Sequence, residues 1–130
     1  MDKRPMISIV DDDKSVRDAT VSLMRAAGYE PEAFCCAQDF LASERVRRTD
    51  CLIADVQMPG MSGIELHGEL VQSGNAIPTV LITAHPNEKA KARALAAGVV
   101  CYLSKPFELN ELLDCIQTAL EPGDTRSEKP

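Results

Sequence analysis

Acidic side chains stand directly after two apolar segments of this sequence. Asp11, Asp12 and Asp13 follow one apolar segment, and Asp55 ends another. Carboxylates held a few Å apart raise one another's pKa and destabilise a fold unless a cation is present. Oxygen ligands on a solvent-facing loop suit Mg²⁺, which keeps several waters and takes few protein groups. These acids therefore predict a magnesium site.

Two further apolar segments end in groups that suit an anion bound beside the cation. Thr83 ends one segment, and Lys105 follows another and precedes Pro106. Taken singly, acids often cap helices, and Asp13 is expected to cap the first helix. A threonine often satisfies a loop, and a lysine can simply end a strand. Taken together, a cation, a nucleophilic carboxylate, a hydroxyl and an ammonium are the parts that phosphoryl transfer needs, because positioning and charge neutralisation dominate that reaction.

The apolar segments themselves predict the strands that position these groups. Residues 6–10, 51–55, 79–83 and 99–103 are continuously apolar rather than alternating, which is typical of parallel strands buried on both faces. A weaker run at 30–34 contains Pro31, which cannot donate to a ladder and therefore belongs at an edge.

Helical patterns lie between these strands. The first has apolar residues at helical spacing from Val16 to Ala27 and stops at Gly28. The third begins with the capping box of Ser62 and Glu65. The remaining helices are expected at 37–47, at 87–97 before Gly98, and around the apolar face of Leu109, Leu112, Leu113, Ile116 and Leu120.

Five β-α repeats predict an α/β fold with a single doubly wound five-stranded parallel sheet and five helices. Right-handed crossovers and the position of the edge strand favour the strand order 2-1-3-4-5. This is one of the common strand orders of doubly wound sheets, and we adopt it for that reason. Ligands bind such sheets at the carboxyl ends of strands where the order reverses. Here that point lies between the strands that end in Asp11 and Asp55.

Four motifs carry a resemblance to a known family. IVDDD, LIADVQMPGMSG, VLITAH and YLSKPF occur in the order and approximate spacing of the receiver domains of two-component response regulators, over about residues 5–121. The resemblance implies a flavodoxin-like fold and a receiver domain at 1–121. MSGIEL and ITAHP resemble the FixJ-type branch, whose members often carry a C-terminal helix-turn-helix output domain, and we expect such a DNA-binding domain outside this chain. Residues 122–130 are expected to be a disordered tail or the start of a linker.

The resemblance implies a role for each acid. Asp55 matches the phospho-acceptor, whose carboxylate attacks the phosphorus of a phosphohistidine on a sensor histidine kinase. Asp12 matches the direct Mg²⁺ ligand, and Asp11 matches the acidic neighbour that often acts through water. The backbone carbonyl of Gln57 would complete the protein's metal ligands.

The resemblance also implies a conformational switch. Lys105 matches the lysine that pairs with the phosphoryl group, and its bond to Pro106 is expected to be cis. Thr83 matches the switch hydroxyl, and Tyr102 matches the switch aromatic that turns inward when Thr83 moves. Packing is the alternative explanation for Tyr102, because an aromatic at a strand end is often just packed.

Further expectations concern the signal that the switch produces. Phosphorylation adds charge and acceptor oxygens, and we expect it to change the face made by the fourth helix, the fifth strand and the fifth helix. Homodimerisation through that face is implied by the resemblance. Gln57 and His85 match the two positions that flank the phosphoryl group in the family that this sequence resembles, and we hypothesise that they set the lifetime of phospho-Asp55 by orienting or excluding the attacking water.

Composition restricts the partners and the location. The 130 residues have a formal net charge of -6, which argues against a nucleic-acid-binding surface in this chain. No stretch approaches the roughly 20 apolar residues that span a bilayer, and the N-terminus lacks the apolar segment of a signal peptide, so we expect a cytoplasmic protein.

In that reducing compartment the five cysteines are interpreted as small core residues. His67 and His85 are expected at the surface, and Cys36 stands where many family members have a helix-capping serine.

The sequence agrees less well with three other functions. A haloacid-dehalogenase-like phosphatase also uses an aspartate nucleophile and Mg²⁺, but it needs a second aspartate at the position of Gln57. A pseudo-receiver signals without phosphorylation, which the complete set of Asp55, Thr83 and Lys105 disfavours. A flavodoxin-type FMN module lacks support because no Ser/Thr/Gly-rich loop follows the first strand. We therefore expect no enzyme activity beyond the domain's own phosphoryl transfer and aspartyl-phosphate hydrolysis.

Overall fold

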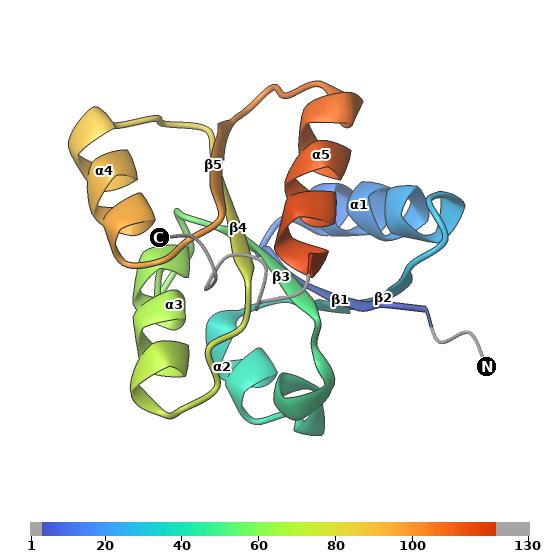
Figure 1. The fold of residues 1–130 in the computed structure, drawn as a ribbon, viewed down its shortest axis with the longest axis horizontal. Helices are drawn as coiled ribbons and strands as arrows, with labels where there is room; N and C mark the ends of the chain where they lie inside the picture. The colour runs from blue at the N-terminus through green and yellow to red at the C-terminus, as the bar shows by residue number, and fades with distance from the viewer. Residues whose placement is uncertain (1–3, 122–130) are drawn as a thin grey trace.

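Five parallel strands form the centre of the computed structural model, which describes residues 4–121 (Figure 1). Their order is β2-β1-β3-β4-β5, as predicted. β3 and β4 are buried along their whole length, which explains their continuous apolar sequences, whereas β2 lies at an edge as Pro31 requires. The strands are β1 (Met6–Val10), β2 (Glu30–Phe34), β3 (Cys51–Asp55), β4 (Thr79–Thr83) and β5 (Cys101–Ser104).

Helices cover both faces of the sheet (Figure 1). On one face α1 (Lys14–Ala26) and α5 (Leu109–Leu120) pack Met24, Leu112 and Ile116 against strand residues such as Ile9 and Ile53. The opposite face is covered by the other helices, whose buried residues include Phe40, Leu66 and Ala94. These are α2 (Ala37–Leu41), the 3-10 helix η1 (Glu44–Arg48), α3 (Gly63–Gln72) and α4 (Glu88–Ala96).

The helix ends follow the predicted signals. The Asp13 side chain accepts hydrogen bonds from the first turn of α1, and Ser62 and Glu65 form the expected capping box of α3. Gly28 and Gly98 have positive φ angles of 94° and 107° just beyond α1 and α4, where a side chain would be strained. Cys36 is the N-cap residue of α2 but makes no side-chain capping bond there, as expected from its departure from the family pattern.

Two predicted boundaries were wrong. The helix expected at 37–47 is divided into α2 and η1, because the side chain of Ser43 accepts a hydrogen bond from Arg45 and begins a new helix. β5 begins at Cys101 rather than residue 99, because the Val99 N–H bonds to the Ala94 carbonyl and closes α4. Both differences depend on competing local hydrogen bonds that the hydrophobic pattern does not contain.

The interpretation of all five cysteines as small core residues was also wrong. Cys101 of β5 and Cys115 of α5 form a disulfide, and their Cα atoms lie 6.0 Å apart. Cys35 is exposed and Cys36 is partly exposed, whereas Cys51 is fully buried as predicted. The pairing depends on how α5 packs against the sheet, so the 14-residue separation alone does not indicate it.

His67 is buried, contrary to the prediction of a surface position. It is only 5% exposed, and it lies on the face of α3 that also carries Gly63, Leu66 and Leu70. The spacing of these residues is that of the buried stripe of an amphipathic helix, so the pattern did contain the signal. Burial lowers the pKa of His67 below its ordinary value near 6.5.

We expect the burial of His67 to make stability depend on pH. Below about pH 6.5 the His67 imidazole binds a proton more readily in the unfolded chain than in the folded chain. The free energy of unfolding should therefore decrease as the pH falls. Urea unfolding at pH 7.5 and pH 5.5 measures this decrease. His67→Gln should reduce the difference between the two pH values, and His85→Gln, at an exposed position, should leave it unchanged. An equal pH dependence in the parent and His67→Gln would contradict the prediction.

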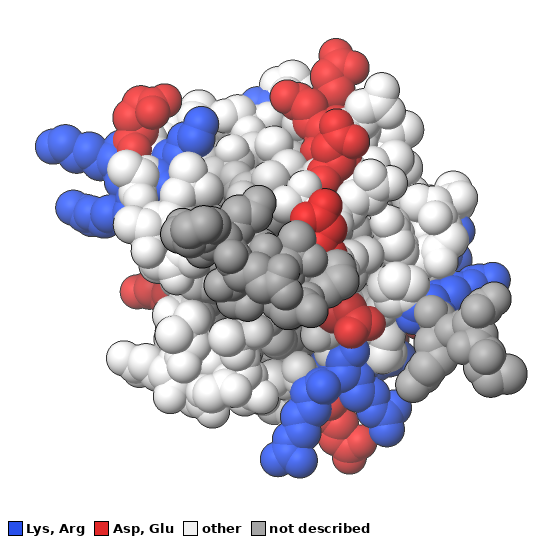
Figure 2. All heavy atoms as spheres, in the orientation of Figure 1, with Lys and Arg blue, Asp and Glu red and all other residues white. Residues whose placement is uncertain are grey.

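Charged side chains form separate small groups on one face of the molecule. On the face seen in Figure 2, Lys and Arg side chains occur in clusters near the margin, and acidic side chains form a column between them. This arrangement differs from the continuous basic face that binds nucleic acid. Among the described residues, no helix is long and apolar enough to cross a membrane.

Candidate functional site

The acids at the ends of β1 and β3 converge as predicted. Asp11 follows β1 and Asp55 ends β3, and the two strands are paired up to Val10 and Ala54. One carboxylate oxygen each from Asp11, Asp12 and Asp55 lies within 4.8 Å of the other two. Asp11 and Asp55 are buried, whereas Asp12 is exposed and opens the group to solvent.

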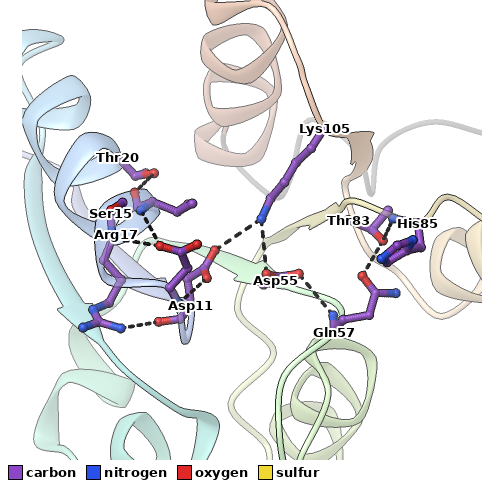
Figure 3. Close-up of polar contacts among 11 residues, drawn as sticks. Asp11, Ser15, Arg17, Thr20, Asp55, Gln57, Thr83, His85 and Lys105 are labelled. Atoms are coloured by element: carbon purple, nitrogen blue, oxygen red, sulfur yellow. Dashed lines mark hydrogen bonds and ion pairs between the residues drawn. The ribbon is translucent and has the colours of Figure 1, made fainter.

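Local hydrogen bonds orient the buried acids (Figure 3). Asp11 Oδ1 accepts the backbone N–H of Asp13 at 2.9 Å, and Asp55 Oδ1 accepts that of Gln57 at 3.1 Å. Burial raises the pKa of Asp11, and the negative charge of Asp55 raises it further, against the opposing effect of the Asp13 hydrogen bond. The group therefore favours a bound cation, because a positive charge offsets both the desolvation and the repulsion.

Lys105 reaches the same pocket from the loop after β5. Its Nζ lies 3.2 Å from Asp55 Oδ2 and 3.7 Å from Asp11 Oδ2, so it bridges the two buried acids (Figure 3). The peptide bond between Lys105 and Pro106 is cis, as the family resemblance implied. The ammonium thus stands where it can pair with negative charge that is added to Asp55.

Thr83 contacts Gln57 rather than an acid. The buried Thr83 hydroxyl donates to Gln57 Oε1 at 2.7 Å and accepts the backbone N–H of His85 at 2.9 Å (Figure 3). The sequence placed these three residues around the expected phosphoryl group but did not indicate the bond between Thr83 and Gln57. That bond joins the loop after β3 to the end of β4, and it depends on the side-chain rotamers.

Tyr102 is buried in the core on the α3 and α4 side of the sheet. It is 8% exposed, and its hydroxyl has no hydrogen-bond partner among residues 4–121. A buried phenol usually finds a partner, because leaving it unpaired costs about 1–3 kcal/mol. The inward position agrees with packing of the ring in the core.

Arg17 is a contributor that sequence reasoning missed. Its guanidinium Nη1 donates to the backbone carbonyl of Asp11 at 2.8 Å, so α1 helps to hold the loop that carries Asp11 and Asp12 (Figure 3). The only signal in the sequence was a cation one turn into a helix that follows an acidic loop. Such a cation is common on a solvent-facing helix and was not distinctive.

The donors in this pocket fit Mg²⁺. They are hard carboxylate oxygens, one of them on an exposed loop residue, which leaves room for the waters that Mg²⁺ retains. The side-chain oxygen of Gln57 accepts a hydrogen bond from Thr83, and the backbone carbonyl of Gln57 is the ligand atom expected from the resemblance.

The same arrangement occurs in a known family. Residues 7–117 match the family model described as response regulator receiver domain. The chain belongs to this family. Receiver domains are components of two-component signalling, and the family's fold is the five-stranded parallel α/β fold found here.

Individual relatives of this receiver domain include proteins named as regulators. Nodulation protein W of Bradyrhizobium diazoefficiens is 38% identical over 125 residues, covering 96% of this chain and 55% of the relative. The response regulator protein TmoT of Ectopseudomonas mendocina is 36% identical and is matched over 58% of its length. The transcriptional regulatory protein FixJ of B. diazoefficiens is 32% identical over 118 residues, and 58% of it is matched. The receiver domain thus spans little more than half the length of these relatives.

Solved structures agree with the fold and with the branch expected from the sequence. The response regulator StyR superposes with a TM-score of 0.86 at 44% identity, over 97% of this chain and 64% of StyR. The structure named FixJ-N superposes with a TM-score of 0.82 at 33% identity, over 93% of this chain and 96% of that one.

Proposed function

We propose that this receiver domain accepts a phosphoryl group on Asp55 from a sensor histidine kinase and signals through the change that follows. The observation that carries the proposal is the position of Asp55, whose carboxylate lies beside Asp11 and Asp12 and 3.2 Å from the Lys105 ammonium. Regulators named among the relatives support the same class of function.

The chemistry assigned to the chain's own residues is limited and specific. A carboxylate oxygen of Asp55 attacks phosphorus, the bond from phosphorus to the imidazole nitrogen of the donor breaks, and an acyl phosphate forms. Lys105 is released from its pairing with the carboxylate and binds a phosphoryl oxygen, which compensates the added negative charge. Mg²⁺ held by Asp11, Asp12, Asp55 and the Gln57 carbonyl would neutralise charge on the transferring group.

The proposed switch begins at the bond between Thr83 and Gln57. A phosphoryl oxygen is a stronger acceptor than an amide oxygen, so the Thr83 hydroxyl exchanges Gln57 Oε1 for the phosphoryl group. Movement of Thr83 at the end of β4 changes the space beside Tyr102 on β5. The two states pre-exist, and phosphorylation acts only through its differential interaction with them.

The direct test uses acetyl phosphate or beryllofluoride with Mg²⁺. Acetyl phosphate should add one phosphoryl group per chain, and mass spectrometry of proteolytic peptides should place it on Asp55. Chelation of Mg²⁺ should suppress the reaction. A phosphate mapped to another side chain would contradict the proposal, and a folded protein that accepts none would indicate a pseudo-receiver.

We also expect Gln57 and His85 to control the lifetime of the acyl phosphate. Replacing both by alanine should slow hydrolysis roughly tenfold, because the amide and imidazole that orient the attacking water are lost. The decay of radiolabelled phosphoprotein measures the rate, and Gln72→Ala, an exposed position near the end of α3, is the matched control. Faster hydrolysis would favour water exclusion over orientation, and an unchanged rate would contradict both roles.

The output belongs to the same proposal. Phosphorylation is proposed to change the face formed by α4, β5 and α5 and to promote a homodimer through it, in a cytoplasmic transcription regulator whose DNA-binding domain lies outside this chain. Light scattering with and without beryllofluoride tests the dimer. A monomer under both conditions would contradict this part of the proposal while leaving phosphorylation of Asp55 intact. The receiver at 1–121 and the tail at 122–130 stay predictions, and the tail lies outside the described residues.

A further inference from the structure

A second group of potential ligands lies between β2 and α2, where no role has been assigned. One donor atom each from Cys35, Cys36 and Asp39 lies within 4.8 Å of the others. The Cys35 thiol already donates to Asp39 Oδ2 at 3.3 Å. The group shares no residue with the acidic pocket of Asp11, Asp12 and Asp55.

Its ligand chemistry differs from that of the acidic pocket. Mg²⁺ and Ca²⁺ take oxygen ligands, whereas two sulfurs and one carboxylate suit a borderline-soft cation such as Zn²⁺. Zinc–sulfur bonds of about 2.3 Å place two sulfurs of a tetrahedral site about 3.8 Å apart. The three donor atoms lie within 4.8 Å of one another, about 1 Å more than that separation at most.

We propose that Cys35, Cys36 and Asp39 bind a divalent cation of the zinc class, with water as the fourth ligand. Cys35 and Asp39 are exposed and Cys36 is partly exposed, so the ion enters without unfolding. Cys36 makes no capping bond to α2, so metal binding does not disrupt a helix cap. Each thiol that binds the cation releases its proton to solvent as the metal–sulfur bond forms.

The Cys35 thiol and the Asp39 carboxylate already lie together, because the thiol donates a hydrogen bond to Asp39 Oδ2 at 3.3 Å. A dication bound by both groups would replace the proton of this hydrogen bond, which is released to solvent.

The other cysteines do not compete for this ion. All five lie within residues 4–121, and Cys101 and Cys115 are bonded to each other. Cys51 is fully buried, and burial raises the pKa of its thiol to about 12. Cys35 and Cys36 are therefore the adjacent, accessible pair of thiols in this chain.

Titration with Cd²⁺ tests the site, because cadmium thiolates have an ultraviolet charge-transfer absorption. The intact domain, in buffer free of thiol reductants, should bind one Cd²⁺ with this absorption, and Zn²⁺ should displace it. Cys35→Ser and Cys36→Ser should each weaken binding at least about a hundredfold, since a hard hydroxyl replaces a thiolate. Asp39→Asn should weaken binding but keep the absorption.

Matched variants separate this site from the rest of the molecule. Cys51→Ala removes a buried thiol and should leave Cd²⁺ binding unchanged. Asp55→Asn disables the proposed phosphorylation and should also leave it unchanged, so the two proposals fail independently. Zinc-edge X-ray absorption of the parent protein should find two sulfur neighbours without any substitution. Absence of sulfur neighbours, or binding that survives both serine replacements, would overturn the proposal.

Discussion

Asp55→Asn should abolish phosphorylation by acetyl phosphate, lowering the rate at least about a hundredfold, because an amide is not a nucleophile that can form the acyl phosphate. The backbone of β3 and the hydrogen bond from the Gln57 N–H to Oδ1 are retained by the isosteric side chain. The variant should therefore fold normally. Intact-protein mass spectrometry over a time course measures the loss.

The same variant should be more stable than the parent in Mg²⁺-free buffer. Asp55 is buried, and two further carboxylates lie within 4.8 Å, whereas the Lys105 ammonium is the cation paired with it among the described residues. Replacing one of the three acids removes charge repulsion and the cost of desolvating a buried carboxylate, and it also removes the ion pair with Lys105. We expect the first two effects to be larger, so that the free energy of unfolding rises by an amount on the order of 1 kcal/mol. Urea unfolding measures the gain, and added Mg²⁺ should stabilise the parent more than the variant.

Asp18→Asn is the control for both effects. Asp18 is exposed on α1 and pairs with Lys14, so its replacement removes a charge of the same kind outside the pocket. Phosphorylation should then continue at the parental rate, and the free energy of unfolding should stay close to that of the parent. Phosphorylation of Asp55→Asn at the parental rate would show that another residue accepts the phosphoryl group.

The sheet and the acids at its edge were predictable because both depend on patterns within short segments. Continuous apolar runs marked β3 and β4, and the order of the strands then placed Asp11 and Asp55 at one edge. The caps at Asp13 and Ser62 were equally local, since each side chain bonds to the helix that it begins. In each cap the side chain and its hydrogen-bond partner are at most a few positions apart.

Side-chain contacts between different elements of the fold were not predictable in the same way. The hydrogen bond from Thr83 to Gln57 spans 26 positions, and the disulfide spans 14. Each depends on the packed position of two elements and on the rotamers of two side chains. The strand order predicted that Thr83 lies near the acidic pocket. It did not predict that, without a phosphoryl group, the Thr83 hydroxyl donates a hydrogen bond to Gln57.

Gly63→Ala should destabilise the protein by about 1–3 kcal/mol, because the site leaves no space for one more carbon. Gly63 is the first residue of α3 and packs against the end of β3, where its N–H bonds to the Val56 carbonyl. A Cβ atom there would lie 2.5 Å from the Asp55 carbonyl oxygen and 3.1 Å from Leu81 Cδ2. Backbone must move to relieve the first contact, since a carbonyl has no rotamer to change.

That movement should also slow phosphorylation at least about tenfold, since displacement of the Asp55 backbone misplaces the nucleophile. Gly68→Ala is a matched control in the same helix, because a Cβ atom at that exposed position meets nothing within 4 Å. It should be neutral or stabilising by up to about 1 kcal/mol, as alanine favours helix. If Gly63→Ala matched Gly68→Ala in both unfolding and phosphorylation rate, close packing of α3 against β3 would not be what positions Asp55.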